Sequence, residues 1–369
     1  MYFMWASMFY LFKCVSFCLA SENTNSYLLL TKNDTLCMGD NNQHQICRTL
    51  DFVLAVVSDA SKFRTSTKIQ ILHNQIGEKN YNLNGLYNFT ISGALNQVTI
   101  RCKPEIGFVF SSSKDVVLTN LTFLRCGSRK NATNNAAISY YAGLYFSNIT
   151  NVDVTSCKVA NSTGIGVALV NVGGMVAFSH TYFTGNIFRS ENGSKVESGI
   201  AHVGGGLTIE FTYSKNDKAF AGKNNIYKFH NCSFINNGCN WNEKNASNPT
   251  EGNGENVIFG CGGGIAATFK SHSEGNAIQL IDCILRDNIA DWGGGYYVLF
   301  EGKSFNNVAC FRNVSMESNY AALSGGGGRF SFLQCCNYME VLSFKPNHFL
   351  QEFCNYTSNS ALWGGGFIQ

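Results

Sequence analysis

Acidic residues, histidines and cysteines are the side chains of this chain that could carry out chemistry, and their spacing limits which chemistry is open to them. The densest acidic cluster is Asp282, Asp287 and Asp291. Glycoside hydrolysis needs two facing carboxylates, and calcium binding needs several acidic ligands together. No two aspartates are adjacent in the sequence. Asp287 precedes Asn288 in a predicted turn, so we interpret it as solvated rather than catalytic.

The other reactive side chains also lack a catalytic arrangement. The seven histidines show no ligand spacing, and the chain contains neither a Cys-x-x-Cys pair nor a Gly-x-Ser-x-Gly motif. Its glycine clusters are not followed by Lys-Ser or Lys-Thr, as a phosphate-binding loop would require. The sequence therefore predicts no catalytic residue, no metal site and no cofactor. With a net charge of +3 and no basic run, it also predicts no nucleic-acid partner.

Two short motifs recur five times and indicate which elements carry these residues. An aromatic or long apolar residue is followed three positions later by Asn, and a Gly-Gly-Gly cluster comes after it. The five copies are Phe183 and Asn186 with 204–206, Phe234 and Asn237 with 262–264, Leu285 and Asn288 with 293–295, Met316 and Asn319 with 325–327, and Tyr356 and Asn359 with 364–366. Repeats a few tens of residues apart are typical of a solenoid, in which each repeat forms one rung.

Short strands are predicted between these motifs. From about residue 81, β-branched and aromatic runs are bounded by Gly, Asn, Ser or Asp, and no helix-length segment separates them. Two degenerate copies extend the repeat, so that equivalent positions fall near 121, 157, 181, 232, 283, 314 and 354. The shortest step, 24 residues, is about what three strands of roughly five residues and their turns require. The predicted fold is an all-β parallel β-helix.

The recurring residue types have structural explanations. The apolar residue would stack on its equivalents inside the coil. Asn tolerates the left-handed conformation of a turn, and its amide can hydrogen-bond to equivalent residues on both neighbouring coils. The glycines permit positive φ and close backbone approach. We therefore predict that both motifs build the frame, and that function lies in the loops at 188–203, 239–260, 300–308 and 329–350.

The N-terminal residues differ from the rest of the chain. Residues 1–20 are almost wholly apolar and end in Cys-Leu-Ala, which predicts a secretory signal cut after Ala20; an uncleaved signal anchor is the alternative. Residues 21–80 are predicted to form a small N-terminal cap or irregular first rungs, with helical spacing in 49–62. Residues 81–369 are predicted to form the β-helix. Because the sequence stops in mid-rung, we expect C-terminal truncation, with further rungs or an anchor in the missing part.

Glycosylation signals and cysteines support an extracellular location. Asn-x-Ser/Thr sequons make candidates of Asn33, Asn88, Asn120, Asn131, Asn148, Asn161, Asn192, Asn231, Asn245, Asn313 and Asn355. Of 15 cysteines, 13 remain after the signal, so one thiol is free or pairs outside the chain. The disulfide candidates are Cys37 with Cys47, and Cys232 with Cys239 or Cys261. Cys157, Cys232, Cys283 and Cys354 recur at one repeat position, either as disulfides between coils or as free thiols.

Residues 180–369 resemble a known family. The Phe-Ile-Asn-Asn at 234–237, and the triple glycines followed by Leu207, Ile265, Tyr296 or Phe367, resemble the FxxN and GGA-I/L/V/Y repeats of the chlamydial polymorphic outer membrane proteins. Here the third residue is Gly rather than Ala in all five copies, and Leu, Met or Tyr replaces Phe in three. The resemblance implies a right-handed parallel β-helix that is secreted or surface-displayed, with an adhesive role.

Together these features predict a non-catalytic adhesive or structural module that binds an extracellular protein or glycan. The alternative is a carbohydrate-active β-helix enzyme of the polysaccharide lyase or glycoside hydrolase type, since β-helices also host such activities. Membrane association is expected only through a missing C-terminal part or an uncleaved signal.

Overall fold

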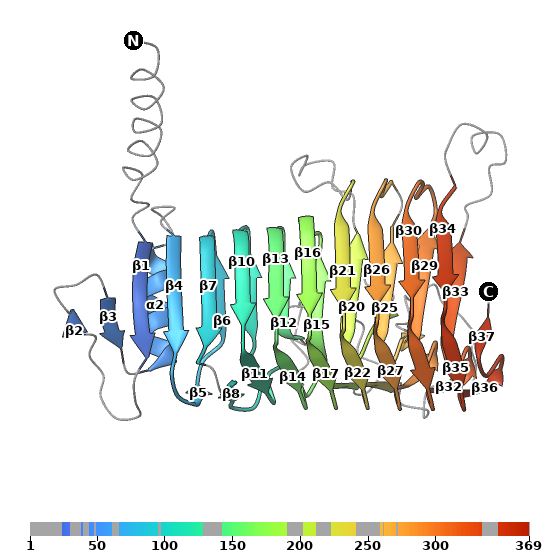
Figure 1. The fold of residues 1–369 in the computed structure, drawn as a ribbon, viewed down its shortest axis with the longest axis horizontal. Helices are drawn as coiled ribbons and strands as arrows, with labels where there is room; N and C mark the ends of the chain where they lie inside the picture. Colours follow the sequence, from blue (N-terminus) through green and yellow to red (C-terminus); the bar gives the residue numbers. More distant parts are fainter. Residues whose placement is uncertain are drawn as a thin grey trace, which may run out of the picture.

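The chain folds into a right-handed parallel β-helix, in which successive coils stack along one axis (Figure 1). The computed structural model describes residues 24–29, 38–39, 44–47, 49–60, 66–94, 97–127, 142–189, 202–211, 223–240, 259–260, 262–270, 272–333 and 346–368. Each coil contributes one strand to each of three long sheets, and neighbouring strands in these sheets come from neighbouring coils. The predicted fold class is confirmed.

Sheet 1 runs the length of the stack, and sheet 2 follows it in each coil. Sheet 1 contains, in order, β2 (Met38–Gly39), β3 (His44–Cys47), β1 (Thr24–Leu29), β4 (Ser66–Ile71), β7 (Tyr87–Gly93), β10 (Lys114–Thr119), β13 (Thr150–Thr155), β16 (Gly173–Ser179), β21 (Ile226–His230), β26 (Ala277–Ile281), β30 (Val308–Arg312) and β34 (His348–Glu352). Sheet 2 contains β5 (Gln75–Gly77), β8 (Val98–Cys102), β11 (Leu121–Leu124), β14 (Lys158–Ala160), β17 (Tyr182–Thr184), β22 (Ser233–Ile235), β27 (Ile284–Arg286), β31 (Ser315–Glu317) and β35 (Asn355–Thr357).

Sheet 3 closes each coil, and a shorter sheet 4 lies between sheets 2 and 3 in the later coils. Sheet 3 contains β6 (Tyr81–Asn84), β9 (Phe108–Ser111), β12 (Ala142–Ser147), β15 (Ile165–Val170), β20 (Leu207–Phe211), β25 (Ile265–Phe269), β29 (Tyr296–Glu301), β33 (Gly328–Leu333) and β37 (Phe367–Ile368). Sheet 4 contains β18 (Ile187–Arg189), β23 (Gly238–Asn240), β28 (Ile289–Trp292), β32 (Tyr320–Ser324) and β36 (Ser360–Trp363). A separate pair joins β19 (His202–Val203) and β24 (Phe259–Gly260).

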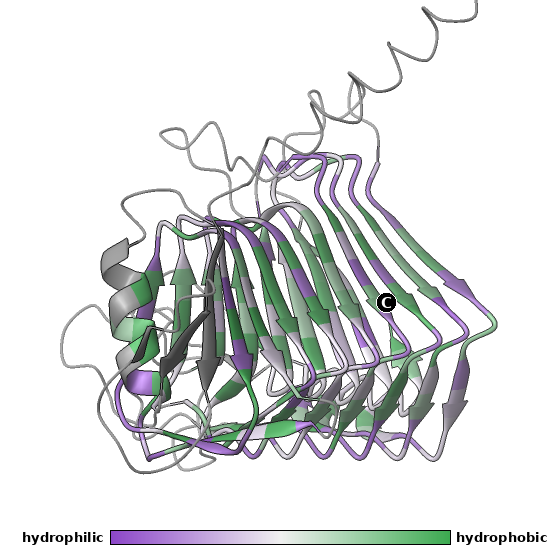
Figure 2. Ribbon diagram, turned by 60° about the vertical axis from the view of Figure 1, so that its left-hand side comes forward, coloured by the Kyte–Doolittle hydropathy of each residue, from purple (hydrophilic) through white to green (hydrophobic). Residues whose placement is uncertain are grey.

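The predicted repeat register is confirmed by strand pairing. Phe183 pairs with Phe234, Phe234 with Leu285, Leu285 with Met316, and Met316 with Tyr356. Phe183 and Phe234 stack with their ring centroids 4.5 Å apart and the planes 5° from parallel. Every step between repeats is therefore one coil, and the longer steps carry insertions. Hydrophobic and hydrophilic residues alternate along many strands (Figure 2), and in strands such as β10 and β21 the buried positions alternate with more exposed ones.

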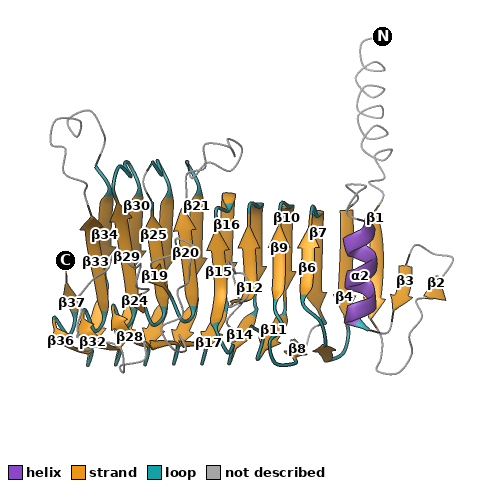
Figure 3. Cartoon of the chain, turned by 180° about the vertical axis from the view of Figure 1, so that it is seen from behind, coloured by secondary structure: helices purple, strands orange, loops and turns teal. Residues whose placement is uncertain are grey.

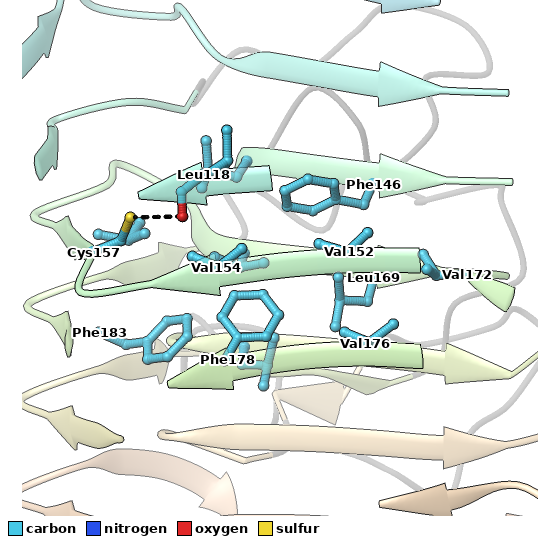
Figure 4. Packing of buried hydrophobic residues seen from close by; sticks show 14 of the residues in the cluster. Leu118, Phe146, Val152, Val154, Cys157, Leu169, Val172, Val176, Phe178 and Phe183 are labelled. Carbon is cyan, nitrogen blue, oxygen red and sulfur yellow. Dashed lines mark hydrogen bonds between the residues drawn. The ribbon is translucent and has the colours of Figure 1, made fainter. Parts of the chain in front are cut away.

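Buried apolar side chains from all three long sheets fill the interior. Phe146 and Leu169 from sheet 3 face Val152 and Val176 from sheet 1 (Figure 4). Each of these side chains is at most 2% exposed. Burial of this kind contributes about 1.5–3 kcal/mol for each large apolar side chain, so the continuous core is the main source of stability.

The recurring asparagines form a buried hydrogen-bonded ladder. The Asn237 backbone N–H and Nδ2 both donate to Asn288 Oδ1, at 3.0 and 3.1 Å, and Nδ2 also donates to the Phe183 carbonyl at 2.9 Å. The predicted ladder is confirmed, but the left-handed conformation predicted for these asparagines is wrong. Positive φ belongs instead to the residue before each of them, namely Gly185, Asn236, Asp287, Ser318 and Ser358.

A second asparagine ladder lies at the corner before sheet 1. Asn225 Nδ2 donates to Asn276 Oδ1 at 3.0 Å, Asn276 Nδ2 to Asn307 Oδ1 at 3.0 Å, and Asn307 Nδ2 to Asn347 Oδ1 at 3.0 Å. This ladder was not predicted, although an Asn precedes each of these strands. Two corners of the later coils are thus held by side-chain amides.

The triple glycines pack backbone against backbone, as predicted. A Cβ on Gly264 would lie 2.5 Å from the Gly295 carbonyl oxygen, and one on Gly295 would lie 2.2 Å from the Gly327 carbonyl oxygen. The first glycine of four clusters also has positive φ, between 60° and 81°. These positions therefore exclude every residue with a Cβ.

Helix α2 (Leu50–Ala60) covers the N-terminal end of the stack (Figure 3). Its residues Leu50, Val53, Leu54 and Val57 are at most 2% exposed and belong to the main core. The helix predicted from spacing in 49–62 and the small N-terminal cap are confirmed. The regular coils begin with β4 at Ser66, inside the segment predicted as cap or first rungs. Among the described residues, no helix is long and apolar enough to cross a membrane.

Candidate functional site

The later strands of sheet 4, β28, β32 and β36, lie side by side in Figure 3, and they present large apolar side chains to solvent. Ile289 begins β28 and Tyr320 begins β32, and the two residues pair in register. Their exposed fractions are 45% and 47%. Leu323 of β32, with Leu362 and Trp363 of β36, are also exposed. We call these five residues the sheet 4 patch.

The packing of the glycine segments explains why these side chains point outward. A Cβ on Gly263 would lie 2.6 Å from the Ile289 backbone nitrogen, and one on Gly294 would lie 2.5 Å from the Tyr320 carbonyl oxygen. The interior is therefore too thin on this side for large residues, and the inward positions Ala290 and Ala321 are small and buried. The usual pattern of large residues inside and small residues outside is reversed. Contiguous exposed apolar residues are typical of an interaction surface.

A tryptophan and an arginine border the patch. The Arg329 guanidinium carbon lies 4.0 Å from the Trp292 ring centroid, within the range of a cation–π interaction. Arg329 also donates to the Ser324 and Ser331 hydroxyls, and Trp292 packs against Tyr297. This rim holds one cation in a defined position beside the apolar surface.

A buried acid lies on the outer face of sheet 3. Glu210 is 4% exposed, and its Oε1 accepts from Lys270 Nζ at 2.9 Å. Its second carboxyl oxygen, Oε2, has no hydrogen-bond partner among the described residues. Burial raises the pKa of Glu210, and the Lys270 charge offsets only part of this effect. Burial also raises the pKa of Glu301, whose charge interacts with the same lysine. A carboxyl whose pKa is raised by burial holds its proton more tightly than a solvated carboxyl does, which is a property of many catalytic acids.

A histidine and an aspartate meet at the corner between sheets 1 and 2. His230 Nε2 lies 3.4 Å from Asp282 Oδ2, and both side chains are nearly half exposed. The neighbouring hydroxyl, Ser179 Oγ, forms a 3.0 Å hydrogen bond with Thr155 Oγ1. Ser179 is thus engaged by another hydroxyl, and the pair offers a surface contact rather than an activated nucleophile.

The acidic cluster of the sequence is separated by the fold. Asp282 accepts from Asn313 Nδ2 at 2.7 Å, whereas Asp287 lies 3.6 Å from Arg286 Nε at the next corner and Asp291 lies in β28. Asp282 and Asp287 each occupy a positive-φ turn position, which explains the residue type. Within the described ranges, no group of three His, Cys, Asp or Glu side chains could hold a metal ion.

The recurring cysteines form a column of reduced thiols beside sheet 2. Cys232 Sγ donates to the Phe178 carbonyl at 3.4 Å, and Cys157 Sγ donates to the Leu118 carbonyl at 3.5 Å (Figure 4). Thr181 occupies the same column and donates to the Val154 carbonyl at 3.2 Å. Five of the seven positions in this column hold a small donor, and Leu121 and Val314 fill the other two with apolar side chains. The predicted disulfide of Cys232 with Cys239 or Cys261 is wrong, because Cys232 is a free thiol that serves this donor role.

One disulfide was not predicted. Cys102 and Cys126 are bonded, with Cα atoms 5.0 Å apart, and join neighbouring coils. Their separation of 24 residues equals the shortest repeat step, and this spacing could have predicted a disulfide between neighbouring coils. Cys239 is buried against Phe188 and Val203 outside sheet 3. Cys37 and Cys261 lie outside the described residues, and Cys47 ends β3.

The described sequons lie at turns or strand ends. Asn120, Asn231 and Asn313 occupy one corner, Asn148 and Asn161 occupy the other two, and Asn88 and Asn355 lie in β7 and β35. Asn33, Asn131, Asn192 and Asn245 lie outside the described residues.

Comparisons with known proteins add little to this geometry. The sequence matches no protein-family profile and no curated protein. One solved structure, a PL6 alginate lyase in complex with a trisaccharide, aligns over 96% of this chain and 88% of its own, with 10% identity and a TM-score of 0.27.

Proposed function

We propose that this chain is a secreted or cell-surface β-helix module that binds an extracellular protein or glycan without catalysis. The sheet 4 patch carries this proposal, because the thin interior excludes large residues on this side, Ile289 and Tyr320 stand in register on the surface, and Leu323, Leu362 and Trp363 are exposed beside them. Exposed aromatics beside a fixed arginine suit both sugar stacking and protein contact. The resemblance of the repeats to those of the chlamydial polymorphic outer membrane proteins supports the same role.

Variants of exposed tyrosines test this proposal. Tyr320→Ser removes a patch residue, whereas Tyr182→Ser removes an equally exposed tyrosine from sheet 2. The purified chain is applied to a glycan array and to intact cells in culture. We expect Tyr320→Ser to weaken binding at least about tenfold, which corresponds to a loss of about 1.4 kcal/mol or more in binding free energy and is typical of removing one interface anchor. Tyr182→Ser should leave the affinity unchanged. Equal effects of the two variants would place the interaction elsewhere.

Glu210 favours a second candidate function, that of a carbohydrate-active enzyme. A buried carboxyl with a raised pKa, paired with Lys270 at 2.9 Å, would supply the general acid of such an enzyme. Neutral and uronic polysaccharides incubated with the chain would release new reducing ends if this function holds. Turnover abolished by Glu210→Gln would establish the enzyme and overturn the non-catalytic module. Binding without turnover would support the module.

A further inference from the structure

One residue position defines the corner between sheets 1 and 2 in every later coil. Seven residues hold it, each with φ between 50° and 55°: Asn120, Ser156, His180, Asn231, Asp282, Asn313 and Phe353. The backbone N–H of Asn120 donates to Thr155, that of Asn231 to Ile281, and that of Asn313 to Glu352, each the last residue of the next sheet 1 strand. The seven positions are therefore aligned along one edge of the stack, which we call the first corner.

The two residues after each corner position point in opposite directions. The next residue faces the core, as shown by Leu121, Cys232 and Val314, which are at most 1% exposed. The residue after it lies in the outward column of sheet 2, where Thr122, Lys158, Tyr182, Ser233, Ile284, Ser315 and Asn355 pair in register. An asparagine at the corner and a hydroxyl in this column together spell Asn-x-Ser/Thr.

Asparagine and hydroxyl occur together at the first corner without exception. Thr122, Ser233 and Ser315 follow Asn120, Asn231 and Asn313, whereas the four corner residues that are not asparagine are followed by Lys158, Tyr182, Ile284 and Asn355. The left-handed turn explains the asparagine, since Asn tolerates positive φ. It does not explain the hydroxyl two residues later.

The other corners show that asparagine alone satisfies the turn. Asn171, Asn224 and Asn306 have positive φ before sheet 1 and are followed two residues later by Gly173, Ile226 and Val308, whereas Asn148 at the same corner is followed by Thr150 and forms a sequon. Asn236 has positive φ after sheet 2 and is followed by Gly238. Asn161 does form a sequon there, but Thr163 Oγ1 donates to the Gly127 carbonyl at 2.8 Å and so has a structural task.

We propose that the first corner is a glycan-bearing edge, with N-linked glycans on Asn120, Asn231 and Asn313. The proposal depends on the secretory location in the proposed function. An oligosaccharide on a diphosphate lipid is the donor: a bond forms between Nδ2 and the anomeric carbon, the bond from that carbon to the diphosphate oxygen breaks, and the amide proton leaves with the diphosphate. One amide hydrogen remains, so Asn313 can still donate to Asp282.

The folded corner has room for this modification. Asn231 and Asn313 are exposed, and Asn120 is half-buried. Coils about 4.8 Å apart place Asn120 roughly 14 Å from Asn231, and Asn231 roughly 10 Å from Asn313. Ser233 lies between Tyr182 and Ile284 in the outward column, so a glycan on Asn231 would cover these exposed apolar residues. The sheet 4 patch lies beyond the next corner and stays uncovered.

Site occupancy tests the proposal. The full chain is expressed in eukaryotic cells, and each sequon is scored by mass spectrometry after enzymatic deglycosylation in heavy-oxygen water. We expect Asn231 and Asn313 to be modified in most molecules. Ser233→Ala should remove one glycan while keeping the corner asparagine, and Asn236→Gly should remove none. Ser315→Ala provides a second test, although its hydroxyl also bonds to Glu317.

A second expression separates failure of this proposal from failure of the secretory location. Residues 21–369 are placed behind an established secretory signal. A secreted chain with Asn231 and Asn313 unmodified would overturn the glycan-bearing edge alone. Modification only behind the added signal would overturn the location and, with it, the edge as a property of the natural chain.

Discussion

Asn237 and Asn236 are adjacent, yet the structure assigns them different tasks. Asn237 is 1% exposed and joins three coils through its amide, whereas Asn236 is exposed with φ of 55°. Asn237→Ala removes the side-chain acceptor of the Asn186 backbone N–H and the Nδ2 donor to the Phe183 carbonyl, at about 1–3 kcal/mol for each unsatisfied buried group, whereas Asn288 Oδ1 keeps the backbone N–H of residue 237. We expect a loss of about 3 kcal/mol or more in the free energy of unfolding, measured by urea denaturation. Asn236→Gly should be nearly neutral, because Gly adopts positive φ freely. A larger loss of stability for Asn236→Gly than for Asn237→Ala would show that Asn237 is the turn residue instead.

Glu210 makes the stability of the chain depend on pH. Burial raises its pKa in the folded state, so the folded chain binds this proton more tightly than the unfolded chain does. The contribution is fully present below the unfolded pKa of about 4.3 and is lost as pH rises through the folded pKa. Glu210→Gln mimics the protonated acid. We expect this variant to match the parent chain at about pH 4 and to unfold at higher temperature than the parent at about pH 8.

Thermal unfolding followed by circular dichroism measures this difference. Glu352→Gln, at an exposed position of sheet 1, controls for the loss of a negative charge. If the Glu210→Gln variant is less stable than the parent under the alkaline condition, the Lys270 ion pair outweighs the cost of burying the carboxylate.

At the scale of elements, the glycine segments let neighbouring coils pack backbone against backbone. A Cβ on Gly295 would lie 2.2 Å from the Gly327 carbonyl oxygen, a backbone atom held in the next coil. Gly238 in β23 offers a matched control, since its nearest neighbour would be 3.7 Å from an added Cβ. We expect Gly295→Ala to lower the free energy of unfolding by about 3 kcal/mol or more, and Gly238→Ala to change it little. A tolerated Gly295→Ala would show that the coils can separate locally.

The same constraint explains how much of the fold the sequence predicts. Asn186 and Gly206 recur with their equivalents because a buried amide must reach the next coil and a crowded backbone excludes Cβ. Such positions admit one residue type, so their spacing reveals the register. The Cys102–Cys126 bond was missed because the coils before Cys157 lack the recurring Asn and Gly residues, so the sequence did not reveal the register that brings the two cysteines together. Their apolar positions accept any large side chain of suitable shape.

The candidate sites were harder to predict because they depend on whether a side chain points into the core or toward solvent. Tyr320 belongs to the surface and Tyr296 to the core, although both begin strands near a glycine cluster. Only the backbone path past Gly294 separates the two cases. Glu210 alternates with inward Ile209 and Phe211 as an outward residue of an exposed face would. Glu210 is buried because the outer face of sheet 3 is covered, and this covering leaves no repeating pattern in the sequence.

At the scale of the whole molecule, stability is distributed along one axis. Each coil pairs only with its two neighbours, so a solenoid behaves as a chain of locally coupled units. Helix α2 supplies the first unit with a cover, through side chains such as Val53, which is fully buried in the main core. A weakened cover should therefore loosen the nearest coil and leave distant coils intact.

Val53→Ala tests this arrangement by removing two methyl groups from the covering helix. We expect a loss of about 1–3 kcal/mol in the free energy that protects the first coil, β4 to β6, from amide hydrogen exchange. Protection of β26 to β29 should stay at the parent level, because several coils lie between the two regions. Ala55→Ser, on the exposed side of α2, serves as the control. An equal loss of protection in all coils would show that the stack unfolds as one cooperative unit, and that the cap stabilises the whole molecule rather than its end.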